Sequence, residues 1–282
     1  MPSTLKCSAW ERKKMQNSDH TFFFAKTIAE LFYQLTSVSG LEVVGGCTSL
    51  ERMPQKAISV HGIPELASIT MHERYLDCGP AVALSDILSL ASARIPEALT
   101  ESVKSIANPF VRNIATIGGN ICAGGIRRTL YAPLLALDAR LELKSALDTV
   151  YVPLLNFTAI PHGSILSNIR IPLGDWDITV FRRLGADSKI TESSASFTFL
   201  ADNEKNMITN IKLAFSGIVT FRCIELENRL IGTRLPLAAK DIALFTETAA
   251  LQFDEAAKDV SYNPILRTQF INLTRYSLEQ LT

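Results

Sequence analysis

Apolar side chains recur every three or four positions over residues 28–35, which places them on one face of a helix. Thr27 lies just before this run and Glu30 follows it three positions later, an arrangement typical of a helix N-terminus. The pattern therefore predicts a helix over residues 27–37.

Shorter apolar or alternating runs, separated by Gly, Pro and polar residues, predict strands in the following part of the chain. Strands are expected at residues 41–44, 57–60, 68–71, 75–78, 140–144, 150–153 and 164–171, and helices at 85–93, 96–107 and 130–137. This order mixes strands, turns and helices, and it differs from the regular alternation of a doubly wound fold.

The segment from Pro172 to Asp175 marks a boundary. Beyond it, strands are expected first and helices afterwards, which is typical of an α+β unit. The strands are predicted at residues 178–183, 195–200 and 208–215, and the helices at 221–230, 237–253 and 263–281. Residues 1–19 are polar, so we expect a mobile N-terminal tail.

Two glycine-containing stretches follow β-branched residues. The longer stretch covers residues 114–125 and the shorter one residues 41–50. Because glycine lets a ligand approach the main chain closely, each stretch could present backbone N–H groups to a phosphate or pyrophosphate. Neither has the spacing of a dinucleotide fingerprint or of a P-loop, and ordinary tight turns remain an alternative.

Composition narrows the function classes. Hydrophobic residues make up 47% of the 282-residue chain, enough for a large core. Lys plus Arg and Asp plus Glu number 28 each, so the net charge indicates neither a nucleic-acid partner nor an acidic membrane. The apolar runs are too short to span a bilayer, and we expect a cytoplasmic protein.

Residues for substrate-directed chemistry are missing from the sequence. The five cysteines and four histidines are scattered, without the spacing of a metal or iron–sulfur site. No hydrolase nucleophile motif or zinc protease motif occurs. Arg127 and Arg128 follow the second glycine stretch and could pair with phosphate or lie in a solvated turn. A chain that binds a large anion without such groups suggests that the ligand performs the chemistry.

At these residues the sequence resembles the FAD-binding subunit of the molybdenum hydroxylases, the group of xanthine dehydrogenase, aldehyde oxidoreductase and carbon monoxide dehydrogenase. Thr116-Ile-Gly-Gly-Asn-Ile-Cys122 is similar to the family's T-I/V-G-G-N-I segment, and Val44-Gly-Gly-Cys-Thr-Ser-Leu50 to its A-G-G-T-D-L-L segment. Further similar pieces lie at residues 63–66, 132–143 and 165–172, in family order.

The resemblance implies an α+β fold: a two-lobed FAD-binding domain of the vanillyl-alcohol oxidase type over residues 20–173, then an α+β domain over residues 174–282, with a small antiparallel sheet plus helices. No catalytic residue and no metal ligand is expected in this chain. The positions that would contact FAD are Val44, Gly45, Gly46, Cys47, Thr48, Ser49, Ile106, Ala115, Thr116, Gly119, Asn120, Thr129, Leu166 and Arg182.

Several positions depart from the family pattern. Thr48 and Thr129 stand where acidic residues are usual, and Cys47 replaces a threonine. Each lost acidic acceptor would remove a charge-assisted hydrogen bond of roughly 1.5 to 3 kcal/mol. FAD binding weaker than the family norm is therefore expected.

The resemblance also implies a place in an electron-transfer complex. A molybdenum-binding subunit would oxidise the substrate, an iron–sulfur subunit would carry the electrons, and FAD in this chain would deliver them to NAD+ or another acceptor. Molybdopterin and the clusters would belong to the partners. Two alternatives stay open: a non-catalytic assembly subunit that has lost or weakened FAD binding, and a free-standing flavin oxidase.

Overall fold

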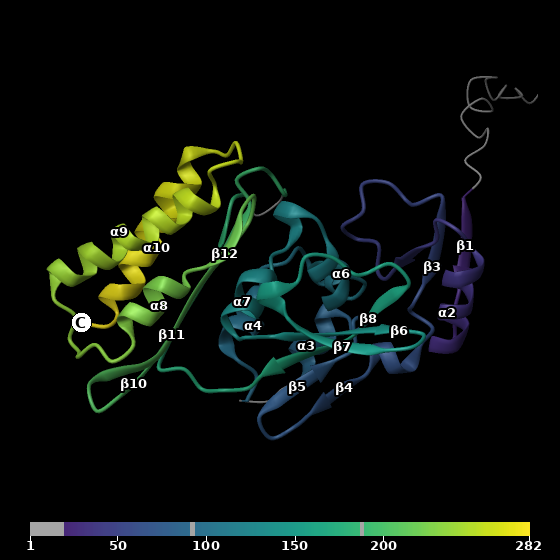
Figure 1. Ribbon diagram of the computed structural model, residues 1–282, viewed down its shortest axis with the longest axis horizontal. Helices are drawn as coiled ribbons and strands as arrows, with labels where there is room; N and C mark the ends of the chain where they lie inside the picture. The colour runs from purple at the N-terminus through teal and green to yellow at the C-terminus, as the bar shows by residue number, and fades with distance from the viewer. Residues whose placement is uncertain (1–19, 91–93, 187–188) are drawn as a thin grey trace, which may run out of the picture.

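The computed structural model describes residues 20–90, 94–186 and 189–282 of the chain. The molecule is elongated, with α2 and β1 at one end and α8, α9 and α10 at the other (Figure 1). The strands are β1 (Thr21–Phe24), β2 (Glu42–Val44), β3 (Lys56–Ser59), β4 (Ile69–Met71), β5 (Tyr75–Cys78), β6 (Arg140–Ser145), β7 (Thr149–Pro153), β8 (Ser164–Pro172), β9 (Ile178–Leu184), β10 (Ala195–Glu204), β11 (Met207–Ser216) and β12 (Thr220–Arg222). The helices are α2 (Ile28–Ser37), α3 (Leu84–Ser89), α4 (Glu97–Lys104), α5 (Pro109–Arg112), α6 (Ile117–Cys122), α7 (Tyr131–Ala136), α8 (Ile224–Leu230), α9 (Ala239–Ala256) and α10 (Pro264–Glu279).

A small parallel sheet lies at the N-terminal end, with strand order β1-β3-β2. Helix α2 packs its buried Leu31 into the same hydrophobic cluster as Ile58 of β3. The expected helix start is confirmed, because the Glu30 N–H donates to Thr27 Oγ1 at 3.1 Å. Glu30 Oε2 in turn accepts from the Lys26 N–H at 2.7 Å, so the helix end is held from both sides.

The central sheet is antiparallel, with strand order β4-β5-β8-β6-β7. Its apolar side chains, including Ile169 and Ile171 of β8, share one hydrophobic cluster with α3, α4, α6 and α7. This cluster also contains Leu200 and Ala214 from the third sheet. The helices therefore connect the central sheet to the C-terminal part of the molecule.

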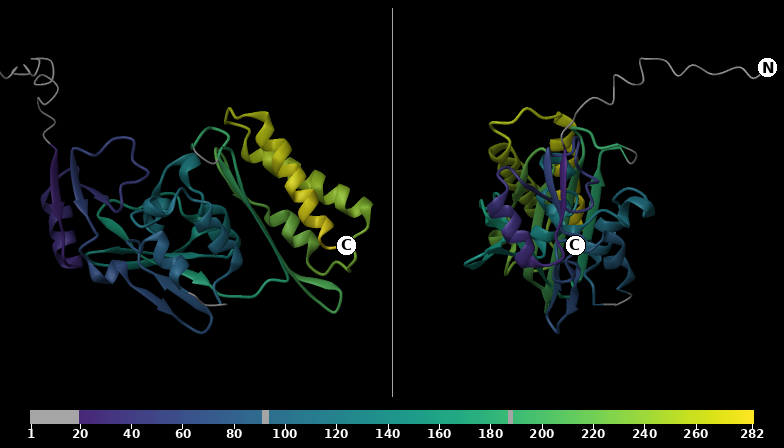
Figure 2. Two further views of the ribbon diagram at one scale, coloured as in Figure 1. Left: turned by 180° about the vertical axis from the view of Figure 1, so that it is seen from behind. Right: turned by 90° about the vertical axis from the view of Figure 1, so that its right-hand side faces the viewer.

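The third sheet is antiparallel, with strand order β12-β11-β10-β9, and stands between the central body and helices α8 to α10 (Figure 2). Successive side chains along each strand point to opposite faces, and both faces of this sheet are buried. Phe197, Phe199 and Phe215 pack with the C-terminal helices, whereas Leu200 and Ala214 face the central cluster. The predicted strands followed by helices are confirmed, and the mixed α+β class with them.

Some predicted elements differ from the structure. The helix expected over residues 221–230 begins only at Ile224, because residues 220–222 pair with β11 as β12. The helix expected over residues 96–107 ends at Lys104, since Ala107 adopts a φ of 45° before Pro109 starts α5. The expected mobile tail at residues 1–19 and the end of the helix expected over 85–93 lie outside the described residues.

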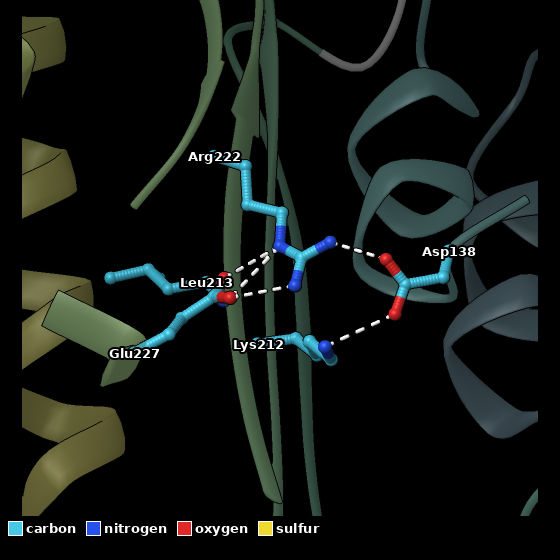
Figure 3. A network of polar contacts seen from close by, with 5 residues as sticks. All are labelled: Asp138, Lys212, Leu213, Arg222 and Glu227. Atoms are coloured by element: carbon cyan, nitrogen blue, oxygen red, sulfur yellow. Dashed lines mark hydrogen bonds and ion pairs between the residues drawn. The ribbon is translucent and has the colours of Figure 1, made fainter. Parts of the chain in front are cut away.

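A buried ion pair joins the third sheet to α8 and to the turn after α7 (Figure 3). The Arg222 guanidinium donates to both carboxylate oxygens of Glu227 at 2.7 to 2.9 Å, and Glu227 also accepts the Leu213 N–H at 2.9 Å. Burial acts to lower the pKa of Arg222, but the hydrogen bonds and negative charges of Glu227 and Asp138 together outweigh it and leave that pKa raised. Asp138 bonds to Arg222 and, at 3.0 Å, to Lys212.

Removing the Glu227 charge should strongly destabilise the protein, because the buried Arg222 is left with only the half-exposed Asp138 as a charged partner. We expect Glu227→Gln to lower the free energy of unfolding by about 3 to 5 kcal/mol. The matched change Asp138→Asn alters a side chain that is 52% exposed, so it should cost less than about 1 kcal/mol. Urea unfolding of both variants measures the difference, and similar losses would contradict this explanation.

Candidate cofactor site

Strand β2 leads directly into the first glycine stretch. Val44 is buried at the strand end, and its carbonyl accepts the Val60 N–H at 3.1 Å. After the two glycines, Cys47 adopts a φ of 56°, and its thiol donates to the Gly45 carbonyl at 3.3 Å. In the described part of the chain, the N–H groups of residues 46–49 have no protein acceptor. They are therefore available to a ligand.

The second glycine stretch forms the short helix α6, and not a turn. Thr116 caps this helix, with its Oγ1 accepting the Gly119 N–H at 3.0 Å. The N–H groups of Ile117 and Gly118 bond to the carbonyls of Val82 and Pro80 at 3.1 and 3.0 Å. That of Asn120 bonds to the Thr116 carbonyl at 3.0 Å. The N–H groups of residues 117–120 are therefore taken by the protein, and this part of the stretch does not present them to a ligand.

The two stretches touch each other through glycine. A Cβ placed on Gly46 would lie 1.8 Å from the backbone oxygen of Ile114, a distance no side chain permits. A Cβ on Gly45 would lie 3.0 Å from Thr116 Oγ1. Only residues without a side chain allow this close approach.

Two adjacent cavities lie beside this contact and share Thr116 and Gly119 in their walls. The larger cavity has a volume of about 300 Å³ and the smaller one about 120 Å³. The larger is within the range of small-molecule sites. It is lined by residues from both stretches, from the α4–α5 connection, from the segment after α6 and from the segment after β9. Its lining residues are Thr48, Ser49, Ile106, Ala107, Val111, Ala115, Thr116, Gly119, Asn120, Arg127, Thr129, Arg183, Lys189 and Ile190.

Comparison with known proteins identifies the family to which this chain belongs. Residues 14–174 match the family described as the FAD binding domain in molybdopterin dehydrogenase, which is more than half of the chain. The chain belongs to this family. FAD is therefore the cofactor that the two cavities would have to accommodate.

Individual relatives are similar over parts of the chain. The xanthine dehydrogenase FAD-binding subunit of Escherichia coli O157:H7 is 33% identical over 124 residues, covering 41% of this chain and 42% of that subunit. The carbon monoxide dehydrogenase medium chain of Hydrogenophaga pseudoflava is 25% identical over 221 residues, covering 73% of this chain and 74% of that one. The alignment with a putative aldehyde oxidase-like protein of Oryza sativa spans only 19% of that protein.

Solved structures confirm the fold. Carbon monoxide dehydrogenase from Hydrogenophaga pseudoflava, in a form without the molybdenum-pyranopterin moiety, aligns with a TM-score of 0.81 at 20% identity. The alignment covers 95% of this chain and 98% of that chain. Quinoline 2-oxidoreductase from Pseudomonas putida 86 aligns with a TM-score of 0.76 at 15% identity, with the same coverage. The two-lobed FAD-binding fold followed by an α+β part agrees with our prediction.

The residues at the two cavities fit an anionic dinucleotide. Gly119 lines both cavities, and a Cβ on it would meet only Thr116 Oγ1, at 2.9 Å, so the backbone at this residue is otherwise uncovered. Thr48, Ser49 and Thr129 contribute neutral hydroxyls to the larger cavity. Its described lining contains cationic side chains and no carboxylate, which suits a ligand with phosphates.

Most of the positions expected from the sequence meet at the cavities. Thr48, Ser49, Ile106, Ala115, Thr116, Gly119, Asn120 and Thr129 line the larger cavity, and Gly45 and Leu166 line the smaller one. Val44, Gly46 and Cys47 shape the first loop without lining either cavity. Arg182 does not line either cavity; its guanidinium donates to the Phe181 carbonyl at 2.7 Å. Its neighbour Arg183 lines the larger cavity.

Asn120 was expected to contact the cofactor, and its side chain also makes two hydrogen bonds to the backbone of the segment after α6. Its Oδ1 accepts the Leu130 N–H at 2.9 Å, and its Nδ2 donates to the Arg127 carbonyl at 3.2 Å. The side chain therefore positions the segment after α6, including Arg127 and Thr129 on the cavity wall. Lys189, also on this wall, was missed, and no motif around it pointed to the site.

The cysteines of the two stretches are not activated nucleophiles. Cys122 lines the smaller cavity, and desolvation by the surrounding protein raises the pKa of its thiol to about 11, although Arg128 acts to lower it. Burial also raises the pKa of Cys47. Both thiols are protonated at neutral pH, so neither supplies a thiolate.

The described residues contain no group of three or more His, Cys, Asp or Glu side chains that could hold a metal ion. Within the same part of the chain, every helix is too short or too polar to cross a membrane.

A side chain at residue 46 should force the two stretches apart. We expect Gly46→Ala to lower the free energy of unfolding by about 2 kcal/mol or more, because the new methyl group would meet backbone that cannot rotate away. Gly174→Ala is the control, since a Cβ there meets nothing within 4 Å. Urea unfolding compares the two variants, and equal stabilities would contradict the close approach.

Proposed function

We propose that this chain is the FAD-binding electron-transfer subunit of a molybdenum hydroxylase complex. Residues 20–173 would form the FAD-binding domain, and residues 174–282 a C-terminal domain whose β9 extension reaches the site. The main support is the combination of family membership with a cavity that is lined by cations and by Thr48 and Ser49, from a loop whose N–H groups have no acceptor among the described residues. The described lining carries no acid, base or activated thiol for chemistry on an organic substrate.

The first loop is suited to hold the phosphates. The N–H groups of residues 46–49 have no protein acceptor among the described residues, so they can donate to phosphate oxygens. Thr116 retains a hydroxyl proton that can donate to the ligand while its oxygen caps α6. The open backbone at Gly119 would let the ligand pass from one cavity to the other.

The remaining proposed contacts surround this centre. Ile106, Ala115 and Leu166 offer apolar surface to the rings, and Thr129 offers a neutral hydroxyl. When bound, FAD supplies the electron transfer that none of these side chains can perform. We place Arg183 and Lys189, in preference to Arg182, as the cations of the C-terminal part that favour negative charge in the cavity.

The partners follow from the same proposal. Relatives such as the carbon monoxide dehydrogenase medium chain are named as one chain of a larger enzyme. By analogy, a molybdenum-binding subunit and an iron–sulfur subunit would supply the electrons, and NAD+ or another acceptor would take them. The complex would work in the cytoplasm. Molybdopterin and the clusters would belong to the partner chains.

A second candidate function is an assembly subunit with little or no FAD. The observation in its favour is that Thr48 and Thr129, both in the larger cavity, replace the acidic residues expected from the resemblance. The two functions differ in one measurement. Purified protein that takes up FAD and becomes reduced through its partner chains supports electron transfer, whereas protein that takes up no FAD supports the assembly role.

A side chain at residue 119 should obstruct the passage between the cavities. We expect Gly119→Ala to weaken FAD binding about tenfold or more, while the folded structure persists because the new methyl group meets only Thr116 Oγ1. Quenching of FAD fluorescence on titration with protein measures the affinity. Gly124→Ala is the control, since that residue lines neither cavity and has open space around it. Unchanged affinity in Gly119→Ala would argue against this site.

A further inference from the structure

The larger cavity has an unusual balance of charge. Arg127, Arg183 and Lys189 line it, and no carboxylate does so among the described residues. Among the described residues, Glu51, just beyond the first loop, forms an ion pair with Arg127. Its Oε1 lies 2.8 Å from Arg127 Nη2. This ion pair connects the first loop to the segment after α6.

The backbone of Arg127 is fixed, but its guanidinium is held weakly. The Arg127 carbonyl accepts from Asn120 Nδ2, and its N–H bonds to the Gly124 carbonyl at 3.4 Å. Among the described residues its guanidinium has one ion-pair partner, Glu51, and the two side chains are 32% and 75% exposed. An exposed pair of this kind contributes little, so a stronger anion can replace Glu51.

The adjacent Arg128 is different. Its Nε donates to the Ala123 carbonyl, and its guanidinium lies 4.9 Å from the centre of the Tyr131 ring. Arg128 also lines neither cavity. Of this arginine pair, therefore, only Arg127 combines a place on the cavity wall with a side chain that can change partners.

We propose that Arg127 contacts a phosphate of the bound dinucleotide and that Glu51 competes for the same guanidinium. This inference rests on the proposed FAD site. A guanidinium binds phosphate through two parallel hydrogen bonds, which a single exposed contact with Glu51 does not match. Arg127 thus shares the cavity wall with Thr48 and Ser49, and its contact would offset the affinity lost with the acidic acceptors absent at residues 48 and 129. Glu51 keeps its side chain at the cavity until the ligand arrives.

The competition predicts changes of opposite sign in the FAD affinity of the full chain. Arg127→Gln should weaken FAD binding about ten- to a hundredfold, because a charge-assisted contact is lost. Glu51→Gln should leave the affinity unchanged or strengthen it up to about fivefold, because the competitor is removed. Arg127→Lys should give an intermediate loss of FAD affinity, since Lys keeps the positive charge but cannot donate two parallel hydrogen bonds to one phosphate. Arg52→Gln, an exposed change in the same loop, should have little effect.

Fluorescence titration with FAD, at low and at raised salt, measures all four variants, and thermal unfolding verifies that each is folded. The loss in Arg127→Gln should be largest at low salt. Weaker binding in both Glu51→Gln and Arg127→Gln would overturn the proposal, since the pair would then be structural. Unchanged binding in Arg127→Gln would overturn it and leave the FAD site intact. Wild-type protein that binds no FAD would overturn the proposed function itself.

Discussion

The close approach of Gly46 to the Ile114 carbonyl is the constraint on which the candidate site depends. It brings together a loop after β2 and the start of α6, two segments far apart in the chain. Because the chain at residue 46 lies against another backbone, the loop that follows cannot turn inward. Cys47 then takes a left-handed φ, and the N–H groups of residues 46–49 stay free of protein acceptors. Both cavities border on this junction.

The C-terminal sheet completes the site from the other side. One face packs its phenylalanines against α8 to α10, and the other meets the central cluster through Leu200 and Ala214. The buried Arg222–Glu227 pair connects this sheet to α8, and Asp138 extends the network to the turn after α7 (Figure 3). The result is that Arg183 and Lys189, late in the chain, reach a cavity built mostly by earlier residues.

Much of the fold followed from local pattern. The period of apolar residues located α2, α9 and α10, and alternation located β6, β8, β10 and β11. Strand β1 was missed because Thr21–Phe24 is a short apolar run without alternation, and it exists only through parallel pairing with β3. Strand β12 was read as helix for a similar reason. Its residues have no local preference strong enough to override the hydrogen bonds offered by β11.

By itself, the sequence determined where the two glycine stretches lie and that threonines stand at residues 48 and 129, where the resemblance leads us to expect acidic residues. Only the tertiary structure decided which of those glycines present free N–H groups. In the second stretch, the N–H groups of Ile117 and Gly118 are taken by the carbonyls of Val82 and Pro80, and that of Gly119 by the Thr116 cap. It also decided that Arg183 and not Arg182 lines the cavity, because adjacent residues of a strand point to opposite faces and only packing selects the face.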